Sequence, residues 1–288
     1  IAYRTSGKCW VNNHAHVLKP KNGLDVDFLC YSLMFYNTDG LVNGATRQKL
    51  TQATMRKMLI PALPIEHQIE VVSQLNKIKE INDLRMREIQ KLDDLVRSRF
   101  VEMFGTYPAN EKGWNIGAIR DVVSEVRYGS SRPAVDGGKY PYLRMNNITY
   151  SGELDLSDTK RIDVPDNELE KCTVRRGDVL FNRTNSRELV GKTCVYDRDE
   201  MMVLAGFVIR VRVNDKVLPE FLSAFLNTDF SKKMLLGMCK TAVGQANINA
   251  KEMQNISLYI PPIAMQQQFV DFKRQVDKSI VAVQKALD

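Results

Sequence analysis

The sequence predicts an α+β protein in which mixed, mainly β domains alternate with long α-helices that pair as an antiparallel coiled coil. Three observations lead to this prediction. One segment of the chain occurs twice, an apolar periodicity continues over roughly 40 positions, and short β-rich runs fill the stretch between the helices. The predicted order along the chain is therefore domain, helix, domain, helix.

The repeated segment reads LTQATMRKMLIPALPIEHQ from Leu50 and INAKEMQNISLYIPPIAMQ from Ile248, an offset of 198 residues. The two copies agree at most apolar positions, at one proline, and at the glutamine that follows it, Gln68 and Gln266. Each copy predicts a short apolar strand, a proline turn, and a long helix whose start is set by the proline.

The first long helix is predicted over residues 65–104, before Gly105 and Pro108. At about 1.5 Å per residue it forms a rod of roughly 60 Å, far longer than a small domain requires. The second helix is predicted over residues 263–288. One apolar stripe on each helix indicates antiparallel pairing, although a stripe is also consistent with an ordinary core-facing side. The stripe of the first helix contains Ile69, Val72, Leu75, Ile78, Ile81, Leu84, Ile89, Leu92, Val96, Phe100 and Met103.

Residues 105–262 are predicted to form a complete, mainly β domain, because short β-rich runs such as GDVLFNR and GKTCVYD alternate there with glycine turns. A helical stretch, LPEFLSAFLNTDFSKKMLLGM, comes late in this domain. A weaker cognate, DVDFLCYSLMFYNTDG, precedes the first long helix. We therefore interpret residues 1–64 as the C-terminal part of a first domain of the same type.

The composition excludes several classes of protein. With 44% hydrophobic and 26% charged residues the chain is globular and not disordered. No run approaches the roughly 18 apolar residues of a membrane helix, and the first residues lack a signal-peptide layout, so we expect a cytoplasmic protein without membrane contact. Five scattered cysteines without a CxxC pair indicate reduced thiols. The net charge of +7 suits a polyanionic partner but does not require one.

The order of these elements resembles the specificity (S) subunit of prokaryotic type I restriction-modification enzymes, in which two target recognition domains alternate with two helical spacers. The resemblance covers essentially the whole chain. The matching segments are residues 6–20, 44–50 and 60–72 in the first copy and residues 128–148, 175–197, 244–253 and 260–269 in the second.

The resemblance implies a non-catalytic subunit that needs no cofactor and binds double-stranded DNA. Each domain reads one half of a split target, while the helices set the gap and dock methyltransferase subunits; a restriction (endonuclease) subunit completes the complex. Two departures stand out, because the first domain lacks its N-terminal half and the second helix is shorter than the first. We therefore expect exposed apolar surface on the first domain, and either a homodimer or a complementing fragment that completes it.

Arginine, asparagine and glutamine on polar loops are the candidate DNA-contacting residues, because these side chains address guanine and adenine in the major groove. Each cluster is equally consistent with solvated turn chemistry. The candidates in the second domain are Arg127, Ser130, Ser131, Arg132, Arg183, Thr184, Asn185, Ser186, Arg187, Lys240, Gln245 and Asn247. In the first domain they are Arg47 and Lys49.

Catalytic and metal-binding alternatives find little support. His14 and His16 alternate as metal ligands on a strand would, but no thiolate or carboxylate cluster accompanies them, which favours packing or hydrogen bonding. The chain has neither a glycine-rich cofactor turn followed by a methyltransferase motif nor a clear nuclease pattern. The competing interpretation is a coiled-coil scaffold, or a truncated inhibitory subunit, without sequence readout.

Overall fold

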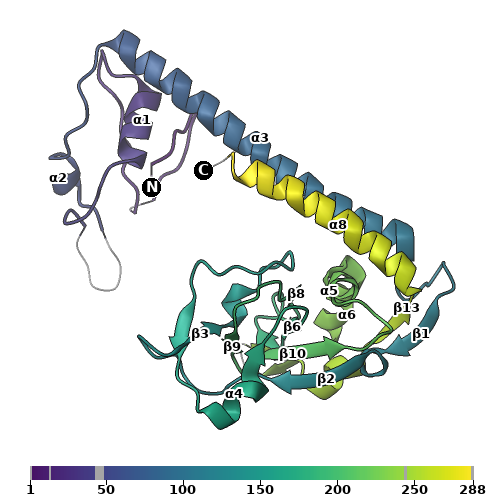
Figure 1. Cartoon of the computed structure of the whole chain (residues 1–288). Helices are drawn as coiled ribbons and strands as arrows, with labels where there is room; N and C mark the ends of the chain where they lie inside the picture. The colour runs from purple at the N-terminus through teal and green to yellow at the C-terminus, as the bar shows by residue number, and fades with distance from the viewer. Residues whose placement is uncertain (1, 13, 43–48, 243–244, 287–288) are drawn as a thin grey trace. The chain divides into compact units, whose positions relative to one another are not determined.

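The computed structural model describes residues 2–12, 14–42, 49–242 and 245–286, with the side chains of residues 240–245 left out of the description. The chain divides into two compact units, Ile1–Arg87 and Glu88–Ala286. Helix α3 (Ile65–Phe104) begins in the first unit and ends in the second, over the residues for which the apolar periodicity predicts it (Figure 1).

The second unit contains four small sheets. One antiparallel sheet has the order β2-β10-β6-β8, and a mixed sheet has the order β4-β3-β9-β5, in which β3 and β9 run parallel. The remaining sheets have the orders β11-β12-β7 and β1-β13. The strands are β1 (Asn115–Ala118), β2 (Val123–Tyr128), β3 (Tyr140–Leu143), β4 (Lys160–Ile162), β5 (Thr173–Val174), β6 (Val179–Asn182), β7 (Thr184–Asn185), β8 (Thr193–Val195), β9 (Met202–Leu204), β10 (Val208–Val213), β11 (Lys240–Ala242), β12 (Gln245–Asn247) and β13 (Ser257–Ile260).

Helices join and cover these sheets. They are α4 (Asp166–Cys172), α5 (Pro219–Asn227), α6 (Asp229–Met238), α7 (Ala250–Gln254) and α8 (Ile263–Gln284), with short 3-10 turns at Ile119–Asp121 and Met145–Asn147. The predicted late helical stretch is two helices, because Thr228 ends α5 and its hydroxyl accepts the Ser231 N–H at the start of α6.

Strand β6 shows how the core is layered. Its side chains alternate, so that Val179 and Phe181 belong to the core cluster shared with the long helices, while Leu180 belongs to a second cluster on the opposite face. All four residues of the strand are buried, which explains why this run is continuously apolar up to Asn182.

Four phenylalanines pack the long helices against the domain that lies between them in the sequence. Phe100 and Phe104 of α3, Phe221 of α5 and Phe269 of α8 are each at most 1% exposed. The ring centroids of Phe100 and Phe269 are 5.2 Å apart and those of Phe104 and Phe221 are 5.0 Å apart. Since Phe269 lies near the start of α8 and its partners lie at the end of α3, the two helices run antiparallel there (Figure 1). The predicted α+β fold with antiparallel long helices is confirmed.

The repeated glutamine is a structural anchor in both copies. In the first unit the side chain of Gln68 is buried, and its Nε2 donates to the carbonyls of Gly23 (2.9 Å) and Leu63 (2.7 Å). Its Oε1 accepts the N–H of Asp25 (2.8 Å), the residue that caps helix α1 (Val26–Met34). The amide thus ties the start of α1 to the start of α3.

Gln266 makes the same set of bonds in the second unit. Its Nε2 donates to the carbonyls of Lys216 (3.1 Å) and Pro261 (2.8 Å), and its Oε1 accepts the N–H of Leu218 (2.8 Å), the N-cap residue of α5. The correspondence makes α1 and α5 equivalent elements, as the weaker sequence match between them predicts.

The two copies also differ. Helix α2 (Gln52–Met55) corresponds to α7, and each is capped by a side chain, Thr51 and Asn249. However, the predicted strand of the first copy is not formed around Leu59, whereas β13 of the second copy pairs with β1. A strand needs a partner for its backbone groups, and the described residues of the first unit supply none there.

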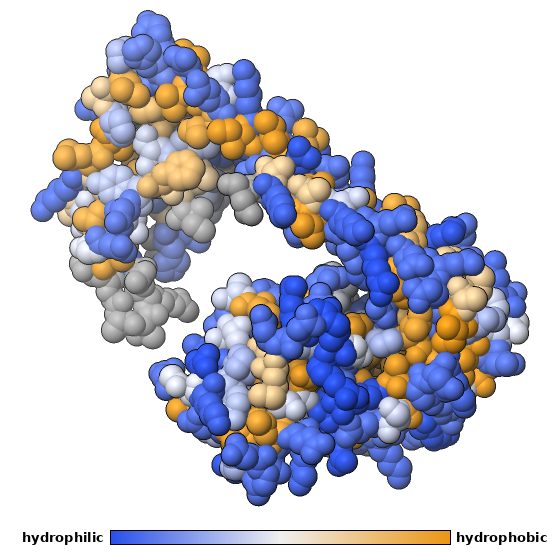
Figure 2. Space-filling model, in the orientation of Figure 1, coloured by the Kyte–Doolittle hydropathy of each residue, from blue (hydrophilic) through white to orange (hydrophobic). Residues whose placement is uncertain are grey.

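The first unit exposes much apolar surface. Trp10 is 99% exposed, Leu59 85% and Phe35 74%, while its buried side chains are few. Figure 2 shows hydrophobic residues on the visible face of this unit, and others over the end of the second unit near β1, where Ile116 is exposed.

The five cysteines are free thiols. No helix among the described residues is both long and apolar enough to cross a membrane.

Replacing Gln266 with Ala should lower the free energy of unfolding by about 2–4 kcal/mol, because each buried polar group that loses its partner costs about 1–3 kcal/mol. Urea denaturation of the full chain measures this change. The exposed neighbour Gln268 provides the control, and Gln268→Ala should leave the midpoint nearly unchanged. Equal midpoints for the two variants would contradict an anchoring role.

A half-buried lysine gives the second unit a pH-dependent stability. Lys232 on α6 donates to the carbonyl of Gly191 (3.1 Å) and lies over the ring of Tyr150. Burial lowers the pKa of Lys232 from 10.5 to about 8, and the nearby charges of Lys192 and Arg97 act in the same direction. Between these two pH values the unfolded chain holds a proton that the folded chain has released, so Lys232 makes folding more favourable as the pH rises.

Replacing Lys232 with Met should remove this contribution. The unfolding free energy of the wild type minus that of the variant should therefore increase from about pH 7 to about pH 10. Urea denaturation at several pH values measures it. The exposed Lys233 on the same helix gives the matched control, Lys233→Met. A difference that stays constant with pH would contradict the depressed pKa of Lys232.

Candidate nucleic-acid interface

A cleft of about 520 Å³ opens in the second unit where four separate loops meet. Three arginines, two aromatic rings and several small residues form its walls. The lining residues are Ser130, Ser131, Arg132, Pro133, Ala134, Tyr142, Arg144, Met145, Asn146, Arg183, Ala205, Gly206 and Phe207. The cleft brings together residues of two predicted DNA-contacting clusters, Ser130, Ser131 and Arg132 from one and Arg183 from the other.

Backbone hydrogen bonds hold two of these loops together. The N–H of Ser130 donates to the carbonyl of Leu204 (2.6 Å), and the N–H of Gly206 donates to the carbonyl of Ser130 (2.7 Å). The approach is close because Gly129 has no side chain: a Cβ there would lie 2.2 Å from the Leu204 carbonyl oxygen and 2.4 Å from that of Ala205. The close approach of these two loops therefore requires glycine at position 129.

Arg183 connects the remaining clusters. Its guanidinium lies over the ring of Tyr128 at 5.0 Å, and its Nη2 donates to Oδ1 of Asn247 (3.2 Å). Its backbone N–H donates to the carbonyl of Phe207 (3.0 Å). Both side-chain partners are neutral, so neither cancels the charge of Arg183 in the cleft. Strand β7, directly after Arg183, pairs with β12 and brings Asn247 opposite Thr184.

Carboxylates restrain the other two arginines. Arg132 makes a two-point contact with Glu168 of α4, from Nε to Oε2 (3.1 Å) and from Nη2 to Oε1 (2.7 Å). This hydrogen bonding holds the pKa of Glu168 below its usual value and that of Arg132 above it. Arg144 reaches the carboxylate of Asp158 (2.9 Å), and its side chain is 24% exposed.

Some polar atoms at the cleft have no hydrogen-bond partner within the described part of the chain. The Nε atoms of Arg144 and Arg183 and the hydroxyl of Thr184 are buried and unpaired. Buried polar groups in folded proteins are nearly always paired. These three atoms are shielded from solvent, so they mark strain in the packing behind the cleft and do not by themselves indicate a ligand.

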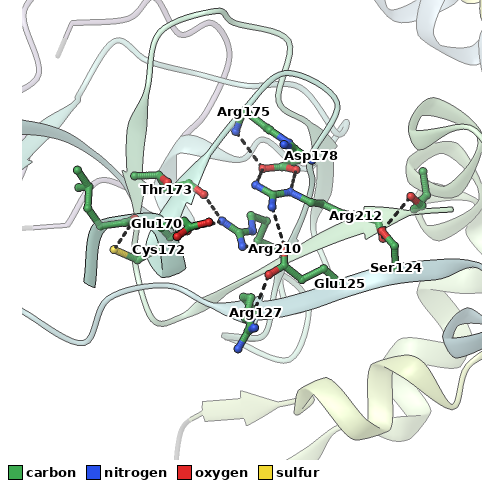
Figure 3. A network of polar contacts seen from close by, with 12 residues as sticks. Ser124, Glu125, Arg127, Glu170, Cys172, Thr173, Arg175, Asp178, Arg210 and Arg212 are labelled. Carbon is green, nitrogen blue, oxygen red and sulfur yellow. Dashed lines mark hydrogen bonds and ion pairs between the residues drawn. The ribbon is translucent and has the colours of Figure 1, made fainter. Parts of the chain in front are cut away.

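The structure places the predicted residues of the second domain differently. Ser131, Arg132 and Arg183 line the cleft, with Asn247 bonded to Arg183. Arg127 and Arg187 are exposed outside the cleft, and Arg127 donates to Glu125 (3.0 Å), which also accepts from Arg210 and Arg212 (Figure 3). Ser130 lines the cleft but is buried, and its hydroxyl accepts the N–H of Arg132 (3.2 Å).

Several predicted loop residues are strand residues. Thr184 and Asn185 form β7, and Thr184 is buried, since pairing with β12 requires it to turn inward. Asn185 and Ser186 make a local turn bond (2.8 Å). Lys240 and Gln245 lie on β11 and β12, and their side chains are outside the description. In the first unit, Lys49 is exposed and Arg47 lies outside the described residues.

Four residues of this region were not among the predicted contacts. Tyr128, Arg144 and Phe207 come directly from strand ends, and Phe207 is 54% exposed despite its place between two buried strands. For Phe207, the feature of the sequence that could have indicated exposure was its position directly after Gly206, a residue type that is frequent in turns. Glu168 gave no sign, because its relation to Arg132 exists only in the folded chain.

The described residues contain no group of three or more histidines, cysteines or carboxylates placed to hold a metal ion. His14 and His16 are both exposed, and the His16 ring lies 3.1 Å from the carbonyl oxygen of Leu50.

The fold and cleft together define a class of protein: an α+β chain in which a long antiparallel helix pair carries a mainly β domain with an arginine-lined cleft. The chain belongs to the type I restriction modification DNA specificity domain family, whose model matches residues 1–94 and 111–287. The resemblance inferred from the sequence is thereby confirmed.

Individual relatives agree with the family. The chain is 22% identical over 283 residues to the type I restriction enzyme EcoKI specificity subunit of Escherichia coli K12, covering 91% of this chain and 61% of that protein. It is 22% identical to a putative specificity subunit, S.HindORF215P, of Haemophilus influenzae, covering 92% of this chain and 67% of that one. The chain thus spans about three fifths of the length of the first of these relatives.

Solved structures show the same fold. A chain from a study of complex assembly and conformational transition of the type I R-M system superposes with a TM-score of 0.56 at 20% identity, covering 91% of this chain and 63% of that one.

Replacing Gly129 with Ala should lower the free energy of unfolding by about 1–3 kcal/mol, because the added methyl group collides with two backbone carbonyls that cannot move independently. Gly237→Ala is the matched control. Gly237 lies in α6 with open space around it, and alanine there should stabilise the helix by about 0.5–1 kcal/mol. Opposite signs in thermal unfolding are expected; two variants that both stabilise would contradict the close approach at Gly129.

Proposed function

We propose that this chain is the DNA sequence-recognition subunit of a type I restriction-modification complex and that it binds a split DNA target. The observation that carries the proposal is the cleft, in which Arg132, Arg144 and Arg183 converge from distant parts of the sequence. Family membership supports the same function.

The chemistry of the cleft suits base readout in the major groove. Arginine offers paired N–H donors that match O6 and N7 of guanine, amides such as Asn247 match adenine, and apolar groups such as Phe207 contact the thymine methyl group. Exposed cations outside the cleft, such as Arg187, would contact phosphates and add sequence-independent affinity.

The remaining parts of the proposal concern partners. The long helices would dock methyltransferase subunits in the cytoplasm, and a restriction subunit would complete the complex. Each copy of the repeat would read one half of the target, with the first copy completed by a second copy of the chain or by a complementing fragment. The chemistry would belong to the partner subunits, and this chain would contribute recognition without a cofactor.

The test is selection from a randomised DNA duplex pool by the full chain mixed with its methyltransferase subunit, followed by sequencing of the bound fraction. One enriched half-site would assign recognition to the second unit alone. Two half-sites at a fixed spacing would mean that both copies read DNA in the assembly. Complex formation without any enrichment would refute sequence recognition and favour a scaffold or inhibitory subunit.

Arg183→Ala should reduce binding of the selected duplex about 5- to 100-fold, because it removes the central uncompensated cation and its paired donors. Binding measured across a salt series should also fall steeply for the wild-type chain, with a log–log slope of roughly −0.9 for each phosphate neutralised. Arg176→Ala, outside this cleft, is the control. Equal affinity for the two variants would exclude the cleft as the DNA site.

A further inference from the structure

Arg132 is held in one orientation by contacts at its backbone N–H, its carbonyl and one edge of its guanidinium. Its N–H donates to the hydroxyl of Ser130 (3.2 Å), and its carbonyl accepts from the hydroxyl of Tyr142 (3.0 Å). Its guanidinium makes the two-point contact with Glu168 through Nε and Nη2. An exposed arginine ordinarily samples many rotamers, so a residue fixed in this way has lost much of its conformational entropy before any ligand arrives.

The contact with Glu168 occupies only one edge of the guanidinium. The group has five N–H donors in a planar fork, and the pair with Glu168 uses one at Nε and one at Nη2. The edge formed by Nη1 and the second N–H of Nη2 has no partner among the residues that the structure describes. Two parallel donors on such an edge match the acceptors O6 and N7 of guanine.

Glu168 is itself fixed from the protein interior. It lies on α4, and the end of α4 is held by Arg210 of β10, whose side chain is 2% exposed. Arg210 donates through Nη1 to the carbonyls of Glu170 and Thr173 and through Nη2 to Glu125 (3.1 Å), as Figure 3 shows. A buried arginine therefore anchors the end of the helix that carries Glu168.

The position of Glu168 is unfavourable for phosphate binding alone. A carboxylate beside the cleft repels the DNA backbone and neutralises one of the cleft cations. Its presence therefore lowers sequence-independent affinity. Orienting an arginine toward a base edge offsets that loss, because a rigid pair of donors discriminates between bases.

We propose that Glu168 is a specificity-determining positioning residue that holds Arg132 with its free edge presented to one guanine of the target. This inference rests on the proposed DNA-recognition function. Glu168 acts through Arg132 and touches no base.

The experiment uses the full chain with its methyltransferase subunit and compares the wild type with Arg132→Ala, Glu168→Gln and the double variant. Each is subjected to the same duplex-pool selection, and its binding is measured on the selected duplex, on duplexes altered at single positions, and on an unrelated duplex. Asp199→Asn is the control, since it breaks a similar exposed pair with Arg176 (2.7 Å) away from the cleft. Melting curves verify that every variant is folded.

We expect Arg132→Ala to lose discrimination at one base pair by about 10- to 100-fold. Glu168→Gln should reduce discrimination at the same base pair several-fold while binding the unrelated duplex more tightly and with a salt slope steeper by about one phosphate. In the Arg132→Ala background, Glu168→Gln should have no further effect on discrimination.

Three results would overturn the inference. Glu168→Gln could leave discrimination at that base pair intact, which would mean that Arg132 needs no orientation. Its effect could persist without Arg132, as expected if Glu168 reads a cytosine amino group directly. Arg132→Ala could weaken all duplexes equally, which would make Arg132 a phosphate contact. Absence of any enriched sequence with the wild-type complex would instead refute the proposed function itself.

Discussion

The packing of four phenylalanines is the constraint on which the second unit depends. Phe100 and Phe104 end one long helix, Phe269 begins the other, and Phe221 belongs to the domain that lies between them in sequence. Such rings contribute through buried area and through their edge-to-face geometry. Because each element supplies at least one ring, the helix pair and the domain core form one hydrophobic cluster, and neither is complete without the other.

The cleft forms only when segments that are far apart in the sequence come together. Its arginines come from three separate segments, and each is oriented by a partner remote in sequence: Glu168 lies 36 residues from Arg132, and Asn247 lies 64 residues from Arg183. Ion pairs of Arg210 with Glu125 and of Arg212 with Glu125 and Asp178 join β2 and β10 to the segment before β6, and the side chains of Arg210 and Asp178 are each 2% exposed. Burying such charges is costly unless they are paired, and the density of pairing here favours a rigid arrangement of these strands over a flexible one.

Periodic features were predictable from the sequence because they depend on local rules. The bounds of α3, the equivalence of Gln68 and Gln266, and the apolar strands all follow from spacing and repetition. Two-residue strands such as β7 carry no periodic signal, and Thr184 was therefore misplaced on a loop. The clustering of the polar loops depends on a close backbone approach at Gly129, which a sequence pattern does not reveal. The sequence therefore predicted the segments that supply the cleft residues. It did not predict which residues of those segments come together.

The repeated glutamine has a consequence for how such chains can diversify. All six bonds that Gln68 and Gln266 make are to main-chain atoms; every amino acid provides the four carbonyls, and every amino acid except proline provides the two N–H groups. The glutamine contacts between a long helix and the neighbouring domain therefore depend very little on the side chains of the contacted segments. A domain with entirely different surface residues can be connected to the helix through the same glutamine contacts with the same geometry. The surface around the cleft can therefore vary in sequence while the connection to the helix stays the same.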